Sequence, residues 1–459
     1  MGTTLQSRSP ECFVKPPSPA KESRQIYNLA AWDIVLLAMQ YIQTGILLQQ
    51  TSLVNQNAIE NFLNLFKQSI SLTLAHFYPL VGRFVTQKTK DPPSTTIFID
   101  CSNSPGVRLI HATLDMSVSD ILTSADNSTI VQSLFDHHKV SNHDGHTMPL
   151  FSAKVTKLVD GLFVGCSMNH AVGDGVAFFN FISAWFEVAR AQVRAGGPLD
   201  NVPISRPPIH DRWFPDGCGP FINLPFKDTD EFKRKFEETE FRERIFHFSG
   251  EFIAKLKARA NWEAKTTEIS SLQSLSAHAW RCITRARHLP RDQRTSCKLA
   301  IDNRSRLEPP LPNEYFGNAL SMVSADSTAG ELLEHDLGWA ARKLNLAVAN
   351  HNDKVVRQEV LHWLQQPKIF HFGSYSDSFD VTVSSSPRFN PFGNDLWLWK
   401  GVKILTGYNN NHDGRLTSSA GAEGGGSIDL EVVISPNAMS ALELDEDFLD
   451  SFSHVAPMH

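Results

Sequence analysis

A turn near the middle of the chain reads Asn169-His170-Ala171-Val172-Gly173-Asp174-Gly175. An apolar run at residues 161–168 leads into it, and residues 176–188, with apolar side chains at helical spacing, follow it. This pattern predicts a strand, a tight glycine-containing turn and a helix, as in an α/β fold. Turns at strand ends hold side chains where ligands commonly meet catalytic groups.

His170 and Asp174 are the candidate functional residues of this turn. Imidazole exchanges protons near neutral pH, because its unperturbed pKa is about 6.5, so His170 is a candidate general base. Asp174 is expected to hold the turn through hydrogen bonds or an ion pair. A chain with 18 histidines contains about one His-x-x-x-Asp by chance, so a turn histidine satisfied by backbone groups is the alternative. The flanking Asn169, Gly173 and Gly175 favour the functional interpretation.

Length and composition predict a globular protein of two domains. The chain has 459 residues, of which 41% are hydrophobic and 20% are charged, and a domain usually holds about 100–200 residues. The formal net charge is −6. Such a charge provides no electrostatic basis for binding a nucleic acid or an anionic membrane.

The cysteines and the apolar segments indicate the cellular compartment of the protein. The six cysteines are scattered without paired spacing, which favours reduced thiols over a zinc site or a disulfide framework. Residues 1–8 are polar, and the apolar stretch 34–48 is interrupted by Gln40, Gln43 and Gly45. That stretch is too short and too polar to span a bilayer. We therefore expect a cytoplasmic protein with no bound metal and no membrane span.

Periodicity predicts the principal elements. Residues 57–77 and 330–363 have helical spacing, and Ser249 and Ser271 are expected to cap two further helices. Residues 151–159 and 162–168 are expected to form a β-hairpin around Asp160-Gly161. Residues 30–49 are ambiguous between strand and short helix. The other expected strands are 95–100, 107–111, 241–248, 299–302, 381–385 and 427–434.

A proline- and glycine-rich segment divides the chain. Residues 191–225 contain Gly196-Gly-Pro-Leu199, Arg206-Pro-Pro-Ile209 and Pro215-Asp-Gly-Cys-Gly-Pro220, a composition typical of a linker. We therefore expect an amino-terminal domain at 1–190 that carries His-x-x-x-Asp, a crossover at 191–225 and a carboxy-terminal domain at 226–459. The expected fold class is α/β with mixed sheets.

Further motifs occur in a defined order along nearly the whole chain. They are Leu29-Ala-Ala-Trp-Asp33, His76-Phe-Tyr-Pro-Leu-Val-Gly-Arg-Phe84, Ile301-Asp-Asn-Arg-Ser-Arg306, Pro309-Pro-Leu-Pro-Asn-Glu-Tyr-Phe-Gly-Asn318 and Glu423-Gly-Gly-Gly-Ser-Ile-Asp-Leu430. With the turn at 170–175, they resemble the plant BAHD acyltransferases, a CoA-dependent family. The resemblance implies two similar domains of the chloramphenicol acetyltransferase-like type, with mixed sheets and flanking helices, joined by a long crossover loop. It also implies that a segment near 375–415 packs back on the amino-terminal domain.

The resemblance assigns roles to individual residues. His170 is implied to be the general base, and Asp174 to point away from the site and pair with Arg304, whose alternative is a solvated surface residue. Gly175 is either a packing glycine or the start of a helix whose amino terminus lies near developing negative charge. The implied co-substrate is acyl-CoA, with no permanently bound cofactor. The implied partners are a small-molecule acyl donor and acceptor, and the implied state is a monomer.

One family motif departs from its usual form. The resemblance predicts Asp-Phe-Gly-Trp-Gly-Lys-Pro, but the chain reads Asp395-Leu-Trp-Leu-Trp-Lys-Gly401. Asp395 and Lys400 match, and Asp395 is expected to be structural. Trp397 and Trp399 stand at the two glycine positions. Because tryptophan adds bulk where backbones pass closely, we expect either a rebuilt loop or an impaired protein.

The implied function is an acyltransferase. It would move an acetyl, aliphatic or hydroxycinnamoyl group from a CoA thioester to a hydroxyl or amine of a plant specialised metabolite. The alternatives are a lyase of the same fold that acts on an acyl conjugate, and a catalytically impaired binding or regulatory member. The presence of His170 favours transfer over the lyase, and an intact His170 and Asp174 argue against a protein that only binds.

Overall fold

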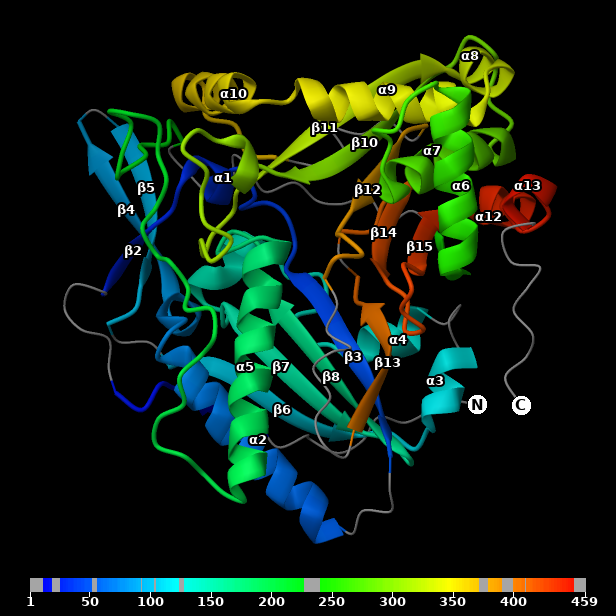
Figure 1. Ribbon diagram of the computed structural model, residues 1–459. Coiled ribbons are helices and arrows are strands. Elements are labelled where there is room, and N and C mark those ends of the chain that lie inside the picture. Colours follow the sequence, from blue (N-terminus) through cyan, green and yellow to red (C-terminus); the bar gives the residue numbers. More distant parts are fainter. Residues whose placement is uncertain are drawn as a thin grey trace.

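The computed structural model describes residues 11–18, 25–51, 56–91, 93–102, 105–123, 128–226, 240–370, 379–389, 399–408 and 410–449. These residues form two large mixed sheets, each with its own helices, and a smaller third sheet at one side (Figure 1). Each large sheet has a separate hydrophobic core. The fold is therefore α/β with two mixed-sheet domains, as expected.

The first large sheet has the strand order β1-β6-β7-β8-β3-β13. Only β6 and β7 run parallel; the other neighbours are antiparallel. The strands are β1 (Glu11–Val14), β3 (Ile42–Gln50), β6 (Val107–Thr113), β7 (Phe151–Lys157), β8 (Gly161–Met168) and β13 (Trp399–Thr406). The helices beside it are α2 (Gln56–Leu74), α3 (Val118–Thr123), α4 (Ser128–Ser133) and α5 (Gly175–Ala195).

Side-chain alternation explains how this sheet buries both of its faces. The cross-strand pair Ile46 and Val164 joins the core beneath α2 and α5. The neighbouring pair, Leu47 and Phe163, points to the opposite face and packs with α3 and α4. A strand that is covered on both faces has few polar positions, which is why residues 161–168 read as a continuous apolar run.

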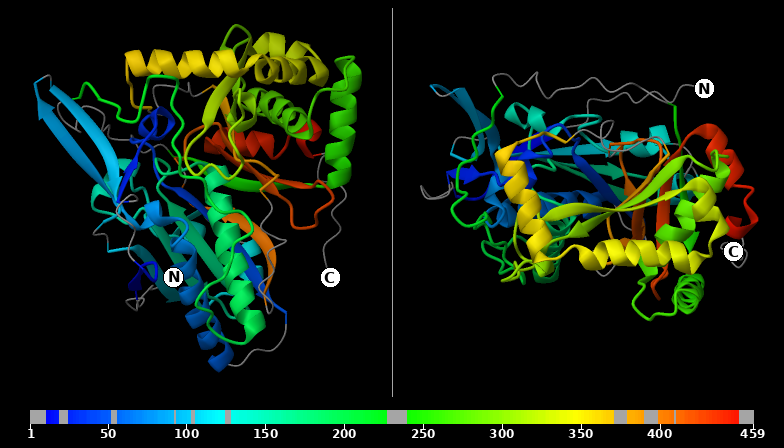
Figure 2. Two further views of the ribbon diagram at one scale, coloured as in Figure 1. Left: turned by 60° about the vertical axis from the view of Figure 1, so that its left-hand side comes forward. Right: turned by 90° about the horizontal axis from the view of Figure 1, so that it is seen from above.

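The second large sheet has the order β11-β10-β12-β14-β15-β9, with β10, β12 and β14 parallel. Its strands are β9 (Arg242–Phe248), β10 (Arg294–Asp302), β11 (Leu320–Thr328), β12 (Val381–Ser384), β14 (Arg415–Ala420) and β15 (Ile428–Ile434). Its outer face is covered by α6 (Gly250–Glu263), α7 (Ser271–Ala286), α9 (Leu337–Asn350) and α12 (Pro436–Leu442), as the two views of Figure 2 make clear.

The remaining elements surround these two layers. The third sheet has the order β2-β5-β4 and consists of β2 (Ile26–Asn28), β4 (Arg83–Lys90) and β5 (Pro93–Asp100). The short helices are α1 (Ala31–Ile34), α8 (Ala329–Glu334) and α13 (Glu446–Leu449), with the 3-10 turns η2 (Tyr78–Val81), η3 (Asn142–His146) and η5 (Arg304–Arg306). Helix α10 (Asp353–Gln365) extends from α9 over α1 (Figure 1).

Several local predictions are confirmed. The helix expected at 57–77 is α2, and the hairpin expected at 151–168 is the antiparallel pair β7 and β8. Ser249 caps α6 by accepting a hydrogen bond from the Phe252 amide at 3.2 Å. The ambiguous stretch 30–49 contains both a helix, α1, and a strand, β3.

Other local predictions are wrong. Ser271 is the first residue of α7 rather than its cap, because Ser270 accepts the capping bond and forms a capping box with Gln273. The helix after the central turn begins at Gly175, one residue earlier than expected, and continues to Ala195, beyond the expected start of the crossover. By contrast, the largely helical region predicted at 330–363 is confirmed, as the helices α8, α9 and α10, of which the last two are capped by Asp336 and Asn352.

One strand crosses between the two halves of the sequence. β13 lies late in the chain, yet it pairs with β3 at the edge of the first sheet. No helix in the described part of the chain combines the length and apolarity needed to cross a membrane.

Candidate functional site

The central turn joins β8 to α5, and neighbouring asparagines hold its backbone. The His170 amide donates to Oδ1 of Asn142 at 2.7 Å, and Nδ2 of Asn318 donates to the His170 carbonyl at 2.8 Å. Asn169 Nδ2 donates to the Asn142 carbonyl at 2.7 Å. His170 is therefore fixed from both sides, by η3 of the first half and by a segment of the second.

Asp33 anchors Asn318 in turn. Its Oδ1 accepts hydrogen bonds from the Asn318 amide at 3.1 Å and from Asn318 Nδ2 at 2.9 Å. Its Oδ2 accepts from Ala30 and is paired with the buried Arg212 of the crossover segment. Asp33 and Asn318 lie inside sequence motifs but had no predicted role of their own; only their polarity between apolar neighbours could have indicated one.

Asp174 caps α5 and forms a buried ion pair. Its Oδ1 accepts from the Ala177 amide at 3.1 Å. Arg304 Nη1 and Nη2 donate to the two Asp174 oxygens at 2.8 and 3.0 Å. Arg304 is 0% exposed, and it also donates to the Gly317 carbonyl at 3.0 Å. The structure thus joins the two residues that the resemblance paired, and the solvated alternative for Arg304 does not hold.

The glycines of the turn allow close packing. A Cβ on Gly173 would lie 2.7 Å from the Ala177 side chain, which is too close for ordinary contact. A Cβ on Gly175 would lie 3.1 Å from the ring of Phe389, which stacks on Phe179 of α5. Gly175 therefore lets an aromatic side chain approach the first turn of α5.

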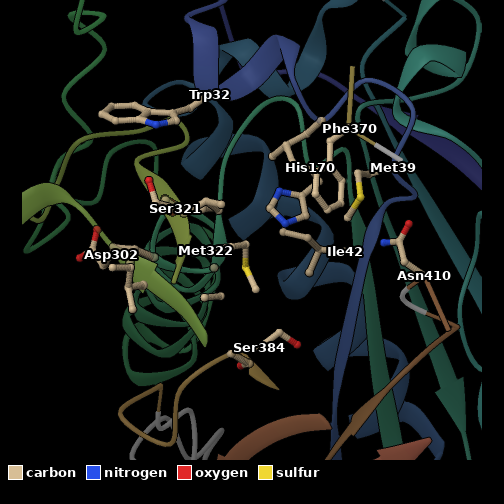
Figure 3. A pocket seen from close by; sticks show the side chains of 18 of the residues that line it. Trp32, Met39, Ile42, His170, Asp302, Ser321, Met322, Phe370, Ser384 and Asn410 are labelled. Carbon is tan, nitrogen blue, oxygen red and sulfur yellow. The ribbon is translucent and has the colours of Figure 1, made fainter. Parts of the chain in front are cut away.

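His170 lines a cavity of about 500 Å³ between the two large sheets. Its walls come from α1, β3, α5, β10, β11, α10, β12 and β14. In Figure 3 the His170 ring points into this space, with Asp302 on one side and Asn410 on the other. Both halves of the chain therefore contribute to a single cavity at the central turn.

The environment of His170 favours the neutral imidazole. Its Nδ1 is buried and has no hydrogen-bond partner among the residues that the structure describes, which leaves Nε2 as the nitrogen that can reach a ligand. Burial lowers the pKa of His170 below the ordinary value of 6.5, and nearby backbone groups, the Asp174 charge and the Asn318 side chain oppose this shift only in part. A neutral imidazole accepts a proton, so the ring is ready to act as a base.

The altered motif lies partly outside the described residues. Asp395 and Trp397 belong to that undescribed part, so the structural role expected of Asp395 stays a prediction. Trp399, at the second glycine position, is 2% exposed in β13, and its ring centroid lies 6.0 Å from that of Phe62. The strand register shifts between Gly401 and Lys403. The bulk of Trp399 is thus accommodated in the core of the first half.

Comparisons with known proteins agree with this architecture. A profile of the Transferase family matches residues 9–449. An uncharacterized acetyltransferase of Arabidopsis thaliana is 32% identical over 447 residues, which cover 95% of this chain and 97% of that protein. BAHD acyltransferase DCR of the same plant is 31% identical, over 95% of this chain and 90% of that protein.

A solved structure shows the same fold. It is F. graminearum TRI101 complexed with coenzyme A and deoxynivalenol, which superimposes with a TM-score of 0.73 over 93% of this chain and 98% of that chain at 16% identity. The profile match spans nearly the whole sequence, and the two plant relatives exceed 30% identity over nearly their full length. The chain therefore belongs to the Transferase family of BAHD acyltransferases, and it is an acyltransferase that transfers groups other than aminoacyl groups.

Proposed function

We propose that this acyltransferase moves an acyl group from a CoA thioester to a hydroxyl or amine of a small plant metabolite, with His170 as general base. Nε2 of His170 removes the proton from the acceptor, whose oxygen or nitrogen attacks the thioester carbonyl. The tetrahedral oxyanion collapses, the C–S bond breaks, and the CoA thiolate takes the proton back from the imidazolium. No acyl-enzyme forms, because the nucleophile is the acceptor itself.

The observation that carries this proposal is the setting of His170. Its backbone is held on both sides by asparagines, its Nδ1 is buried, and its ring points into the shared cavity. A base held in one orientation can act without prior rearrangement, and such positioning contributes strongly to rate. The Asp174 carboxylate is bonded to Arg304 and to the Ala177 amide at the start of α5. Its role is therefore to hold the turn rather than to move the proton.

The first turn of α5 is a candidate for stabilising the oxyanion. Gly175 and Val176 line the cavity, and the first amides of a helix have no partner within the helix. The positive end of the helix dipole adds a favourable potential at this point. Gly175→Ala would leave these amides in place but bring a methyl group toward Phe389, so it tests packing separately from amide donation.

The acyl donor, the compartment and the oligomeric state are inferred from separate observations. A fold relative has been solved with coenzyme A, and an acetyl, aliphatic or hydroxycinnamoyl thioester fits the family. We also infer a cytoplasmic monomer without a permanently bound cofactor. All six cysteines are free thiols, which suits a reducing compartment.

The test is release of CoA thiol from purified protein with a panel of acyl-CoA donors and pooled plant alcohols and amines. His170→Ala should lower acceptor-dependent release by roughly 10²–10⁴-fold while the melting curve stays cooperative. The matched control is His335→Ala, because His335 is an exposed histidine of the second half that does not line the cavity. Full activity of the His170→Ala protein would reject the mechanism.

If the folded wild-type protein releases no thiol with any pair, the proposed transfer is wrong for this chain. That result would favour the alternative functions, a lyase of the same fold or a catalytically impaired binding protein.

A further inference from the structure

The cavity has two chemically different walls. The wall built by α1, β3, the segment between them and α10 carries apolar side chains such as Leu36, Met39 and Trp363. A second group of lining residues, which we call the polar wall, consists of Thr382, Ser384, Thr406, Asn410, Arg415 and Thr417. A cavity that only had to hold a hydrocarbon chain would not need these groups, since burying polar atoms costs free energy.

The polar wall follows from the register of the second sheet. Thr382 pairs with Arg415, and Ser384 pairs with Thr417. The residues between them, Val383 and Leu416, turn to the other face and pack into the core beneath α7. One face of β12 and β14 is therefore polar and faces the cavity, while the other face is apolar.

Two donors of the polar wall lack a protein partner. The hydroxyl of Thr382 and Nε of Arg415 make no hydrogen bond within the described part of the chain, and the two residues are only 5% and 3% exposed. Oδ1 of Asn410 accepts a hydrogen bond from the Gln40 amide at 2.7 Å. Figure 3 shows the side-chain nitrogen of Asn410 turned toward the cavity. Buried polar groups without partners in a cavity wall point to a ligand or to bound water.

The guanidinium of the polar wall already has carboxylate partners. Arg415 is paired with Glu431, which also accepts from Thr406. Burial and the nearby Glu431 raise the pKa of Glu243, which lies 3.7 Å from Arg415, well above its usual range. Arg415 therefore has carboxylate partners within the protein, and its Nε–H remains as a hydrogen-bond donor of the polar wall.

The charged neighbours of the polar wall form pairs of their own. Lys298 lies 2.9 Å from Asp380, and Arg287 lies 2.6 Å from Asp413. Burial lowers the pKa of His412, which also lines the cavity, to about 4, so its ring is neutral near pH 7. These groups add no net charge that would attract an ionic ligand to this wall.

We propose that the acyl acceptor is an uncharged compound with at least two oxygen functions, one that reacts at His170 and one that binds the polar wall. The proposal rests on the proposed function, since it names the acceptor class of that reaction. Arginine donates hydrogen bonds but never accepts them, and an ammonium group also only donates. A cationic amine would therefore meet Arg415 without gaining a hydrogen bond, whereas a hydroxyl, ether or carbonyl oxygen would satisfy the orphan donors.

The experiment measures binding in the absence of acyl-CoA, by calorimetric titration. The probes are linear α,ω-diols, the monoalcohols of the same chain lengths and the corresponding ω-amino alcohols. The diol of the best length should bind the wild-type protein roughly three- to tenfold more tightly than its monoalcohol, the gain of about one hydrogen bond. The amino alcohol should bind no better than the monoalcohol.

Thr382→Val removes the unpartnered hydroxyl at nearly constant volume. It should abolish the advantage of the diol and leave monoalcohol binding unchanged. The matched control is Thr156→Val, because Thr156 is a strand threonine whose hydroxyl is also buried and unpartnered but lies outside the cavity. Diol binding by the Thr156→Val protein should match the wild type.

Asn410→Asp is the second variant. It keeps the oxygen that accepts from Gln40, tolerates the positive φ of 59° at this position, and replaces the free amide with a carboxylate. It should reverse the preference in favour of the amino alcohol. Equal wild-type affinity for diol and monoalcohol would overturn the proposal, as would tightest wild-type binding of the amino alcohol through Asp302 or Glu359, which also line the cavity.

These titrations need no turnover. Failure of the thiol-release assay would therefore reject the transfer reaction without altering the binding comparison, and failure of the binding comparison would leave transfer intact.

Discussion

Arg304 lies 130 residues after Asp174 in the sequence, and its guanidinium holds both oxygens of the Asp174 carboxylate, at 2.8 and 3.0 Å. The pair connects the start of α5 in the first half to η5 in the second. Because Arg304 is fully buried, its charge depends on this carboxylate, together with Asp302 at 2.9 Å. The turn that carries His170 and the interface between the halves therefore share one ion pair.

Asp174→Ala should lower the stability of the whole protein. Removing one partner of a buried pair typically costs about 3–5 kcal/mol, because the other charge is left uncompensated. The melting temperature measures the loss. Asp336→Ala is the matched control, since Asp336 caps α9 in the same way, accepting from Trp339 at 2.8 Å, and a cap alone is worth about 1 kcal/mol. Equal losses from the two variants would show that the ion pair contributes nothing.

Asn318→Ala should reduce turnover through the position of His170. The variant removes the bond to the His170 carbonyl, and a shift of about 1 Å in a reacting group can cost roughly 100-fold in rate. We expect kcat to fall more than KM rises. Asn345→Ala serves as the control, because Asn345 is a buried asparagine of α9 that bonds Glu268. If both variants lose stability alike and keep the same kcat, Asn318 is only structural.

The pH dependence of kcat/KM should place the acidic limb below pH 6.5. Burial lowers the pKa of His170 from its ordinary value of 6.5, so the imidazole remains neutral, and able to accept a proton, down to a lower pH. Activity should rise with pH through this limb and then level off. A limb centred at or above pH 6.5 would contradict the environment described for His170.

Trp399→Ala should destabilise the protein without a specific effect on catalysis. Trp399 is buried beside Phe62, and truncating a buried tryptophan typically costs about 3–5 kcal/mol. The fraction that remains folded should keep its kcat, because Trp399 does not line the cavity. Trp262→Ala is the control: that ring is 81% exposed, and its loss should change stability by less than about 0.5 kcal/mol. A fall in kcat with unchanged stability would place Trp399 in the reaction instead.

The sequence predicts local structure correctly where the pattern involves residues close together in the chain. Helix α2 follows from apolar side chains at helical spacing, and the β7–β8 hairpin follows from two apolar runs around Asp160-Gly161. The cap at Ser249 has a local chemical cause, a hydroxyl three residues before the amide that it satisfies. The central turn itself, with His170 between a strand and a helix, was also readable because all its parts are adjacent in the chain.

The arrangement around His170 depends instead on residues far apart in sequence. Asn318 lies 148 residues from His170 and 285 from Asp33, and β13 returns to the first sheet between β12 and β14 of the second. No periodicity encodes such contacts, and a buried asparagine or threonine has the same letter as a solvated one. Packing of the two sheets determines which polar groups are buried together. That packing also leaves Thr382 and Arg415 facing a cavity with donors that no group in the described ranges satisfies.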